Sequence, residues 1–276
     1  MTAAVALTVA GSDPSGGAGV QADLKTFSAL GVYGTAVLTA LTAQSTRGVT
    51  GVHAVPAAFV GEQLRTLLAD VTVHATKLGM LGTADVVHEV AAVLADRPAG
   101  PVVCDPVMVA TSGDRLISDD AVDAVRSVLL PVTDLLTPNV PEAAALLDVA
   151  PATTVDELAP QAAALLALGP GAVLLKGGHL GGAESTDVLV TAAGVVESRR
   201  PRVPTTATHG TGCTLSSAVA ALVARTRLAA PDEPVDWAPL VEGARDYLQA
   251  ALVEGESLRV GAGHGPVHHF AGWWPA

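Results

Sequence analysis

The sequence predicts an α/β fold in which a mostly parallel central sheet is covered by helices on both faces. Short uninterrupted apolar runs alternate along the chain with longer stretches in which apolar residues recur every three or four positions. Runs of the first kind are typical of strands buried on both faces, and the second pattern is typical of amphipathic helices. Regular alternation of the two favours parallel strands joined by helical crossovers.

The strands and helices can be assigned in order along the chain. Residues 5–10 form the first apolar run, and Val20, Leu24 and Phe27 then repeat at the spacing of one helix face. The remaining expected strands are residues 36–41, 75–79, 101–105, 135–137 and 172–176. The expected helices between them are residues 60–68, 86–94, 121–130, 142–147 and 161–168.

The pattern changes late in the chain. Residues 187–191 and 195–199 flank an Ala-Ala-Gly sequence, which predicts a small β-hairpin at the edge of the sheet. Helices are expected at residues 212–225 and 237–254, and the residues after them are loop-like. Because no repeat, low-complexity tract or linker interrupts the chain, we expect residues 1–276 to form a single domain.

Composition limits the classes of function. The 276 residues include 15 basic and 27 acidic side chains, and this net charge of −12 argues against nucleic acid and anionic membranes as partners. Cys104 and Cys213 are too few for a disulfide framework and lack the spacing of a zinc site. The first residues lack the basic start of a signal peptide, and no apolar run has the length of a membrane span. We therefore expect a cytoplasmic protein.

Polar residues that could form a ligand site follow the expected strands. In parallel α/β sheets, ligands bind at the carboxyl ends of the strands. Here these ends are occupied or followed by residues 11–13, Gln44, residues 77–80, Asp105, Asn139 and Lys176. The sequence therefore predicts one composite site at this edge of the sheet.

Residues 208–214 (Thr-His-Gly-Thr-Gly-Cys-Thr) are the most informative segment. Their two glycines lead directly into a stretch rich in Ala, Leu and Val that is expected to be helical. Free backbone N–H groups and the positive dipole end of such a helix suit an anion, such as a phosphate in transfer. The same residue types also occur at ordinary helix starts. A thiol at this position, Cys213, is expected to have a lowered pKa.

Residues 11–19 (Gly-Ser-Asp-Pro-Ser-Gly-Gly-Ala-Gly) join the first strand to the first helix. They lack the Gly-Lys-Ser/Thr ending of a P-loop and the spacing of a dinucleotide fingerprint. The loop could wrap a small ligand or serve as a turn that needs permissive residues. Asp23 could reach back to this loop or lie on a solvated helix face.

Two acidic residues and one lysine complete the candidate site. Asp105 ends a buried strand, where a carboxylate is costly unless it is paired or binds a metal. Together with Glu142 it could hold Mg²⁺, which takes one or two carboxylates and keeps several waters; Glu142 could instead stabilise a helix N-terminus. Lys176 precedes two glycines and could clamp a phosphate or extend to solvent.

Eight segments occur in a known family order across nearly the whole chain. They are residues 11–27 (GSDPSGGAGVQADLKTF), 42–48 (TAQSTRG), 77–81 (KLGML), 104–108 (CDPVM), 137–142 (TPNVPE), 176–179 (KGGH), 209–214 (HGTGCT) and 265–270 (GPVHHF). Together they resemble the hydroxymethylpyrimidine/phosphomethylpyrimidine kinases of thiamine biosynthesis, in the ribokinase-like superfamily. No single segment is specific by itself, but the combination is.

The resemblance implies a ribokinase-like three-layer sandwich and a kinase that depends on ATP and Mg²⁺. Such an enzyme phosphorylates 4-amino-5-hydroxymethyl-2-methylpyrimidine and then converts the monophosphate to the diphosphate. The resemblance also implies a homodimer. It assigns the hydrogen bonds to the pyrimidine to Gln44, and the remaining substrate contacts to Gly11, Asp23, Met80 and Val107.

The resemblance also assigns the phosphate chemistry. Asp105 and Glu142 match the acidic positions on the magnesium side, and Lys176 matches a lysine that contacts phosphate. The anion hole and the contacts to the nucleotide phosphates fall on Gly210, Thr211 and Gly212. Cys213 stands where most related sugar kinases have an aspartate as general base, and a thiolate could accept the hydroxyl proton. Phosphoryl transfer through a loose transition state needs little help from a base, however.

Two alternatives stay open at this point. A pyridoxine or pyridoxal kinase of the same superfamily would bind a ring of similar size, and Thr42 and Ser45 beside Gln44 depart from the usual family residues. A non-catalytic pyrimidine-binding sensor is the other alternative, but it would need no phosphate-binding residues. Residues 110–115 contain a Ser-Gly pair and are a candidate for a flap over the site.

Overall fold

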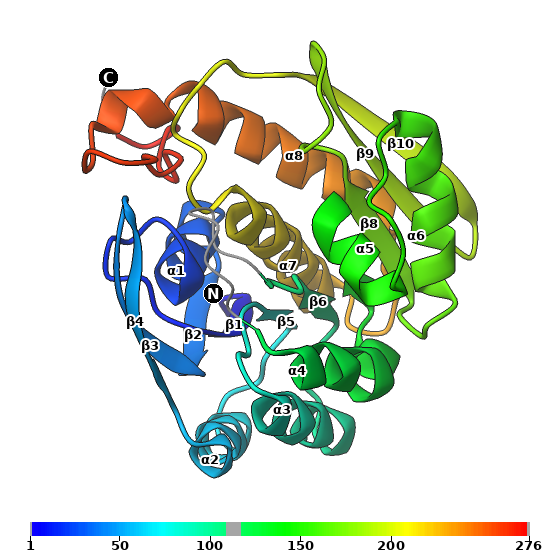
Figure 1. The fold of residues 1–276 in the computed structure, drawn as a ribbon. Coiled ribbons are helices and arrows are strands. Elements are labelled where there is room, and N and C mark those ends of the chain that lie inside the picture. Colours follow the sequence, from blue (N-terminus) through cyan, green and yellow to red (C-terminus); the bar gives the residue numbers. More distant parts are fainter. Residues whose placement is uncertain (1, 109–116, 275–276) are drawn as a thin grey trace.

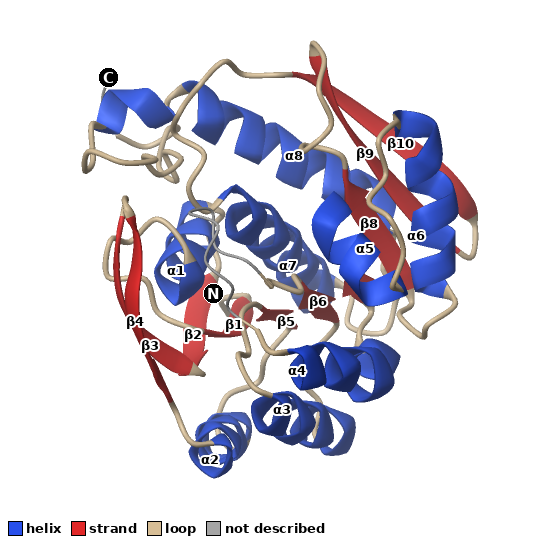
Figure 2. Ribbon diagram, in the orientation of Figure 1, coloured by secondary structure: helices blue, strands red, loops and turns tan. Residues whose placement is uncertain are grey.

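An eight-stranded sheet forms the centre of the molecule and confirms the expected α/β architecture (Figures 1 and 2). The computed structural model describes residues 2–108 and 117–274, so the flap expected at residues 110–115 lies outside the described residues. The strand order is β10-β9-β8-β7-β6-β5-β1-β2. Neighbours from β2 to β8 pair in parallel, whereas β9 and β10 are antiparallel.

The bounds of the elements agree with most of the sequence-based assignments. The strands are β1 (Val5–Ala10), β2 (Tyr33–Leu38), β3 (Ala40–Ser45), β4 (Gly48–Ala54), β5 (Ala75–Leu78), β6 (Val102–Cys104), β7 (Leu135–Leu136), β8 (Ala172–Lys176), β9 (Glu184–Thr191) and β10 (Gly194–Pro201). The α-helices are α1 (Gly19–Ala29), α2 (Ala57–Leu68), α3 (Ala84–Asp96), α4 (Asp119–Ala124), α5 (Val140–Leu147), α6 (Leu158–Leu166), α7 (Thr211–Ala229) and α8 (Trp237–Val253).

The sheet separates two apolar cores. Side chains from α2 to α6 form one core, and side chains from α1, α7 and α8 form the other, so the helices lie on opposite sides of the sheet in Figure 1. Within β8, Val173 and Leu175 point into the first core and Ala172 and Leu174 into the second. Both faces of the strand are buried, which explains why its sequence is a continuous apolar run.

The expected strand at residues 36–41 is divided between two strands, because the chain leaves the main sheet within it. β2 ends at Leu38, and the buried Thr39 donates its hydroxyl to the Met80 carbonyl at 2.7 Å. β3 then pairs with β4 in a separate two-stranded antiparallel sheet beside α1 and β2 (Figure 1). The apolar run extends across the turn, so periodicity alone did not locate the break.

The other departure is in the expected helix at residues 121–130. There α4 ends at Ala124 and passes into a π-helical turn (Val125–Leu129), followed by a 3₁₀ turn (Leu130–Val132) that contains Pro131. The expected edge hairpin is confirmed as β9 and β10. Within residues 2–108 and 117–274, no helix is both long and apolar enough to cross a bilayer.

Candidate active site

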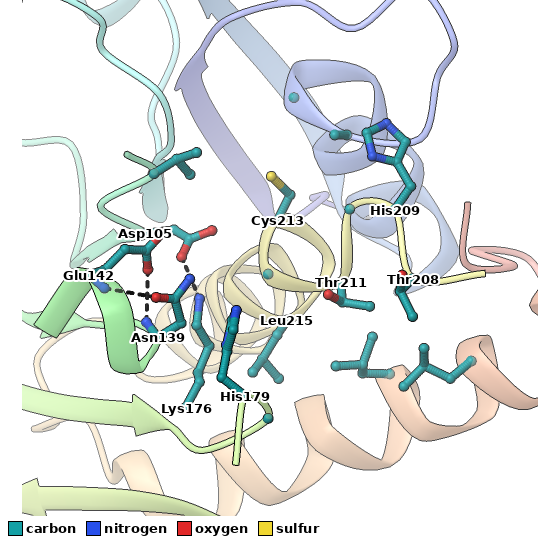
Figure 3. A pocket seen from close by; sticks show the side chains of 18 of the residues that line it. Asp105, Asn139, Glu142, Lys176, His179, Thr208, His209, Thr211, Cys213 and Leu215 are labelled. Carbon is teal, nitrogen blue, oxygen red and sulfur yellow. Dashed lines mark hydrogen bonds and ion pairs between the residues drawn. The ribbon is translucent and has the colours of Figure 1, made fainter. Parts of the chain in front are cut away.

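One cavity of about 670 Å³ lies at the carboxyl ends of the parallel strands, as the sequence predicted. The ends of β1, β5, β6 and β8 and the N-termini of α5 and α7 meet there (Figure 3). Most of the expected site residues line this cavity: Gly11, Gln44, Met80, Asp105, Val107, Glu142, Lys176, Gly210, Thr211, Gly212 and Cys213.

The turn that begins α7 has the geometry of an anion hole. Gly210 caps the helix in the left-handed conformation, with φ 79°, and a Cβ there would overlap the carbonyl oxygen of Gly17. Within the described part of the chain, the N–H groups of Gly212 and Cys213 have no acceptor. These groups and the dipole of a 19-residue helix therefore face the cavity available for an anion.

Lys176 and Asp105 form an ion pair beside this turn. The Lys176 Nζ lies 2.7 Å from Asp105 Oδ1, and both side chains are largely buried. Burial lowers the pKa of Lys176, but the charges of Asp105 and Glu142 outweigh this effect, so the net pKa is raised. A Cβ on Gly212 would lie 3.3 Å from Lys176 Nζ, which shows how closely the ammonium approaches the glycine turn.

Glu142 stabilises a helix N-terminus, one of the two roles that the sequence left open. It forms a capping box at the start of α5, with Oε2 accepting from the Asn139 N–H at 2.8 Å and its own N–H donating to Asn139 Oδ1 at 2.9 Å. It also lines the cavity (Figure 3). Burial raises the pKa of Glu142 to about 7, with Lys176 lowering it and Asp105 raising it.

The acidic residues fit Mg²⁺ only together with phosphate oxygens and water. No group of three or more His, Cys, Asp or Glu side chains within residues 2–108 and 117–274 is placed to hold a metal by itself. Asp105 and Glu142 supply two carboxylates at one end of the cavity, the number that magnesium commonly takes from a protein. The donor set therefore suits a metal that arrives with a phosphorylated ligand.

The expectation of a lowered thiol pKa for Cys213 is wrong for this structure. Burial raises the pKa of Cys213 to about 11; the Lys77 ammonium lowers it, and the carboxylates of Asp23 and Asp105 raise it further. Desolvation and the two negative charges raise the pKa by more than the position at the helix N-terminus was expected to lower it. The thiol nevertheless lines the cavity and lies at the third position of α7 after its cap.

Asp23 is not among the residues that line the cavity, contrary to the expected substrate contact. Its carboxylate is fully buried and accepts hydrogen bonds from Lys77 Nζ at 2.9 and 3.0 Å. The hydroxyls of Thr8 and Ser217 each add a bond at 2.6 Å. These four contacts occupy both oxygens, so Asp23 holds Lys77 in place, and Lys77 is the residue that lines the cavity.

Gln44 and the residues expected to form the pyrimidine pocket lie together at one end of the cavity. Gln44 stands at a β-bulge in β3, and its Oε1 is 3.2 Å from the Thr42 hydroxyl. Met80 packs so closely on Gly11 that a Cβ there would lie 2.5 Å from the Met80 Cε. The apolar wall is completed by the half-buried Val107.

Two buried pairs at the cavity were not predicted. His209 Nε2 lies 2.7 Å from Asp13 Oδ2, and the same carboxylate accepts from the N–H groups of Gly17 and Ala18. This pair ties the loop at residues 11–19 to the α7 turn. The other pair joins Arg245 of α8 to Asp187 of β9 at 3.3 Å. Neither pair has a sequence signal, because the partners lie far apart in the chain.

Comparisons with known proteins agree with this geometry. The family model described as phosphomethylpyrimidine kinase matches residues 13–268. The hydroxymethylpyrimidine/phosphomethylpyrimidine kinase of Escherichia coli strain K12 is 52% identical over 98% of both chains. The thiamine biosynthesis multifunctional protein ThiED of Corynebacterium efficiens is 50% identical over 96% of this chain and 35% of that protein.

Solved structures of two related kinases superpose on the chain. A pyridoxal kinase from Bacillus subtilis in an ADP complex gives a TM-score of 0.87 at 32% identity, covering 98% of both chains. A phosphomethylpyrimidine kinase from Clostridium difficile gives a TM-score of 0.75 at 35% identity, covering 90% of this chain and 98% of that one. The sheet order, the glycine turn and these similarities lead to one conclusion: the chain belongs to the phosphomethylpyrimidine kinase family, with a ribokinase-like fold.

Proposed function

We propose that the protein uses ATP to phosphorylate 4-amino-5-hydroxymethyl-2-methylpyrimidine and then its monophosphate, as part of thiamine biosynthesis. The observation that carries this proposal is that Gln44, Met80 and Val107 line the same cavity as Lys176 and the glycine turn. High identity to curated kinases of this name supports the choice of substrate.

The pocket end of the cavity positions the acceptor. Gln44 offers an amide that can pair with the ring nitrogen and amine of the pyrimidine, while Met80 and Val107 supply apolar surfaces for its two faces. This placement directs the hydroxymethyl group toward Cys213 and the free N–H groups of the α7 turn. Orientation of this kind is a large part of catalysis in phosphoryl transfer.

The other end of the cavity suits the nucleotide. Lys176 and the N–H groups at Gly212 and Cys213 would neutralise the charge of the phosphoryl group in transfer. Asp105 and Glu142 would hold Mg²⁺, which supplies further positive charge to phosphate oxygens when it is bound. Solved relatives contain ADP or an ATP analogue, which supports ATP as the donor.

Cys213 is the group nearest to the reacting hydroxyl in this proposal. With a pKa of about 11, about one thiol in 10⁴ is ionised at pH 7 in the absence of substrate. We therefore assign Cys213 first to orienting the hydroxyl and second to accepting its proton as the new O–P bond forms. Lys77 is the neighbouring cation that favours the thiolate.

A pyridoxal kinase is the second candidate, and one observation favours it. The pyridoxal kinase from Staphylococcus aureus in complex with ADP superposes with a TM-score of 0.88, above the 0.75 of the Clostridium difficile phosphomethylpyrimidine kinase. Identity to that pyridoxal kinase is only 29%, however, compared with 52% to the curated pyrimidine kinase of Escherichia coli. Sequence therefore favours the pyrimidine.

Product analysis by mass separates these candidates. The protein is incubated with magnesium-ATP and, in separate tubes, hydroxymethylpyrimidine, its monophosphate or pyridoxal. We expect diphosphate from the monophosphate, a product that a plain pyridoxal kinase would not make. Phosphorylation of pyridoxal alone would establish the second candidate, and no transfer to any acceptor would indicate a pyrimidine-binding sensor.

Self-association is a separate part of the proposal. The family resemblance implies a homodimer, and large apolar side chains are exposed around the β3–β4 hairpin, among them Leu41, Val52 and Phe59. Sedimentation velocity of the purified protein tests this part directly. A monomer at micromolar concentration would contradict it without affecting the proposed reaction.

A further inference from the structure

The carbonyl of Gly210 is fixed by two hydrogen bonds from the same residue. It accepts from the backbone N–H of Thr214 at 2.8 Å and from the hydroxyl of the same residue, also at 2.8 Å. The peptide group is planar, so fixing this carbonyl also fixes the direction of the Thr211 N–H. That N–H donates a long hydrogen bond of 3.3 Å to the Thr208 carbonyl, and the free N–H groups of Gly212 and Cys213 follow it in the same turn.

The Thr214 hydroxyl is in turn contacted by a histidine from the far end of the chain. His269 Nε2 lies 3.1 Å from Thr214 Oγ1, and both residues are buried. A hydroxyl has a single proton, and here that proton is directed to the Gly210 carbonyl. With the hydroxyl proton assigned to the Gly210 carbonyl, His269 is assigned as the donor, with its own proton on Nε2.

The surroundings of His269 maintain this arrangement. Burial lowers the pKa of His269 to about 3, with Lys25, His268 and His209 nearby contributing in the same direction, so the ring is neutral and has one N–H. The Tyr247 hydroxyl donates to the His269 carbonyl at 2.7 Å. The segment that contains His269, residues 265–270, is also held by the His209 N–H, which donates to the Gly265 carbonyl at 3.0 Å.

The geometry points to His269 as a positioning residue for phosphoryl transfer, which acts through Thr214 to set the peptide plane between Gly210 and Thr211. His269 is not among the residues that line the cavity. Its effect is expected on the rate of transfer more than on substrate binding. This inference rests on the proposed kinase function and names a further residue that serves it.

A double-mutant cycle tests the inference, with kcat and KM measured for the pyrimidine. We expect His269→Phe to lower kcat about 5- to 10-fold, the usual effect of one lost hydrogen bond, with KM changed less than about twofold. Thr214→Val should do the same. The double variant His269→Phe/Thr214→Val should lose no more kcat than the more affected single variant, because both substitutions break the same chain of hydrogen bonds.

Three further variants make the test independent of folding. His269→Gln keeps an N–H donor at the Nε2 position and should restore kcat to within about threefold. Thr214→Ser keeps the hydroxyl and should remain close to wild type, which tests the contact even if His269→Phe does not fold. His88→Phe is the matched control, because it makes the same substitution at an exposed position of α3 that does not line the cavity, so kcat should be unchanged.

Several outcomes would overturn the inference. They are a wild-type kcat in folded His269→Phe, a multiplicative loss in the double variant, or no difference between Thr214→Ser and Thr214→Val. If the wild type phosphorylates pyridoxal and not the pyrimidine, the same cycle is measured with pyridoxal. The role of His269 is then tested even though the proposed substrate is wrong. A wild type without kinase activity on either acceptor would overturn both.

Discussion

Replacing Lys77 by methionine should destabilise the protein strongly, because it leaves a buried carboxylate without its cation. Lys77 and Asp23 are both fully buried, and both carboxylate oxygens accept from the ammonium, at 2.9 and 3.0 Å. Breaking such a pair from one side costs about 3–5 kcal/mol. For a chain of this size, that loss corresponds to a fall in Tm of about 6–20 °C.

The assay is thermal unfolding followed by circular dichroism, with two controls. Lys77→Met/Asp23→Asn removes the unpaired charge and keeps one oxygen that can accept from Thr8 or Ser217, while the new NH2 can donate to the other hydroxyl, so it should be more stable than Lys77→Met alone. Arg65→Met breaks an ion pair of 2.8 Å whose side chains are 46% and 28% exposed, and should cost less than about 1 kcal/mol.

Equal Tm values for Lys77→Met and Arg65→Met would refute the reasoning. So would a double variant less stable than Lys77→Met. The same experiment separates the two interpretations of Asp23: if it contacted the pyrimidine, Asp23→Asn would raise KM at unchanged Tm, whereas the structure predicts a lower Tm.

Three other changes probe the site itself. Cys213→Ser should bind substrate with KM changed less than about threefold but lose about 10²-fold in kcat; near-normal turnover would remove its catalytic assignment. Because the Glu142 pKa is raised to about 7, its carboxylate is charged above that pH, so the KM for Mg²⁺ should rise as pH falls from 8 to 6. Glu142→Gln should weaken Mg²⁺ binding and remove this pH dependence, and a persistent slope would assign it to another group. Gly210→Ala places a Cβ against Gly17 at a positive φ and should abolish activity, as measured by product formation; wild-type turnover would show that the turn tolerates a shift.

Much of the fold could be predicted because its signals are local. Buried parallel strands such as β8 are continuous apolar runs, and their polar ends meet at one edge of the sheet by topology alone. The hairpin of β9 and β10 was evident from its short turn. The β3–β4 sheet was missed because the turn at Thr39 depends on a hydrogen bond to Met80, which sequence periodicity does not record.

The sequence predicted which residues line the site better than it predicted their contacts and pKa values. Lysine and acidic residues at strand ends were identified from sequence, but the roles of Asp23 and Cys213 depend on neighbours from three other elements. Lys77 on β5 draws Asp23 away from the cavity, and the combined burial and negative charge raise the Cys213 pKa. Effects of this kind depend on distances between segments, which no local pattern specifies.

The bond between His209 and Asp13 has a consequence for how the protein is made. The two residues are 196 positions apart in the chain. At 5–20 residues per second, synthesis of the intervening chain takes about 10–40 s, during which the Asp13 carboxylate lacks its bond to His209. The loop closes only after α7 has emerged, and closing so long a segment is entropically costly. On the ribosome the central strands therefore gain their neighbours first, and ligand binding is acquired among the last steps.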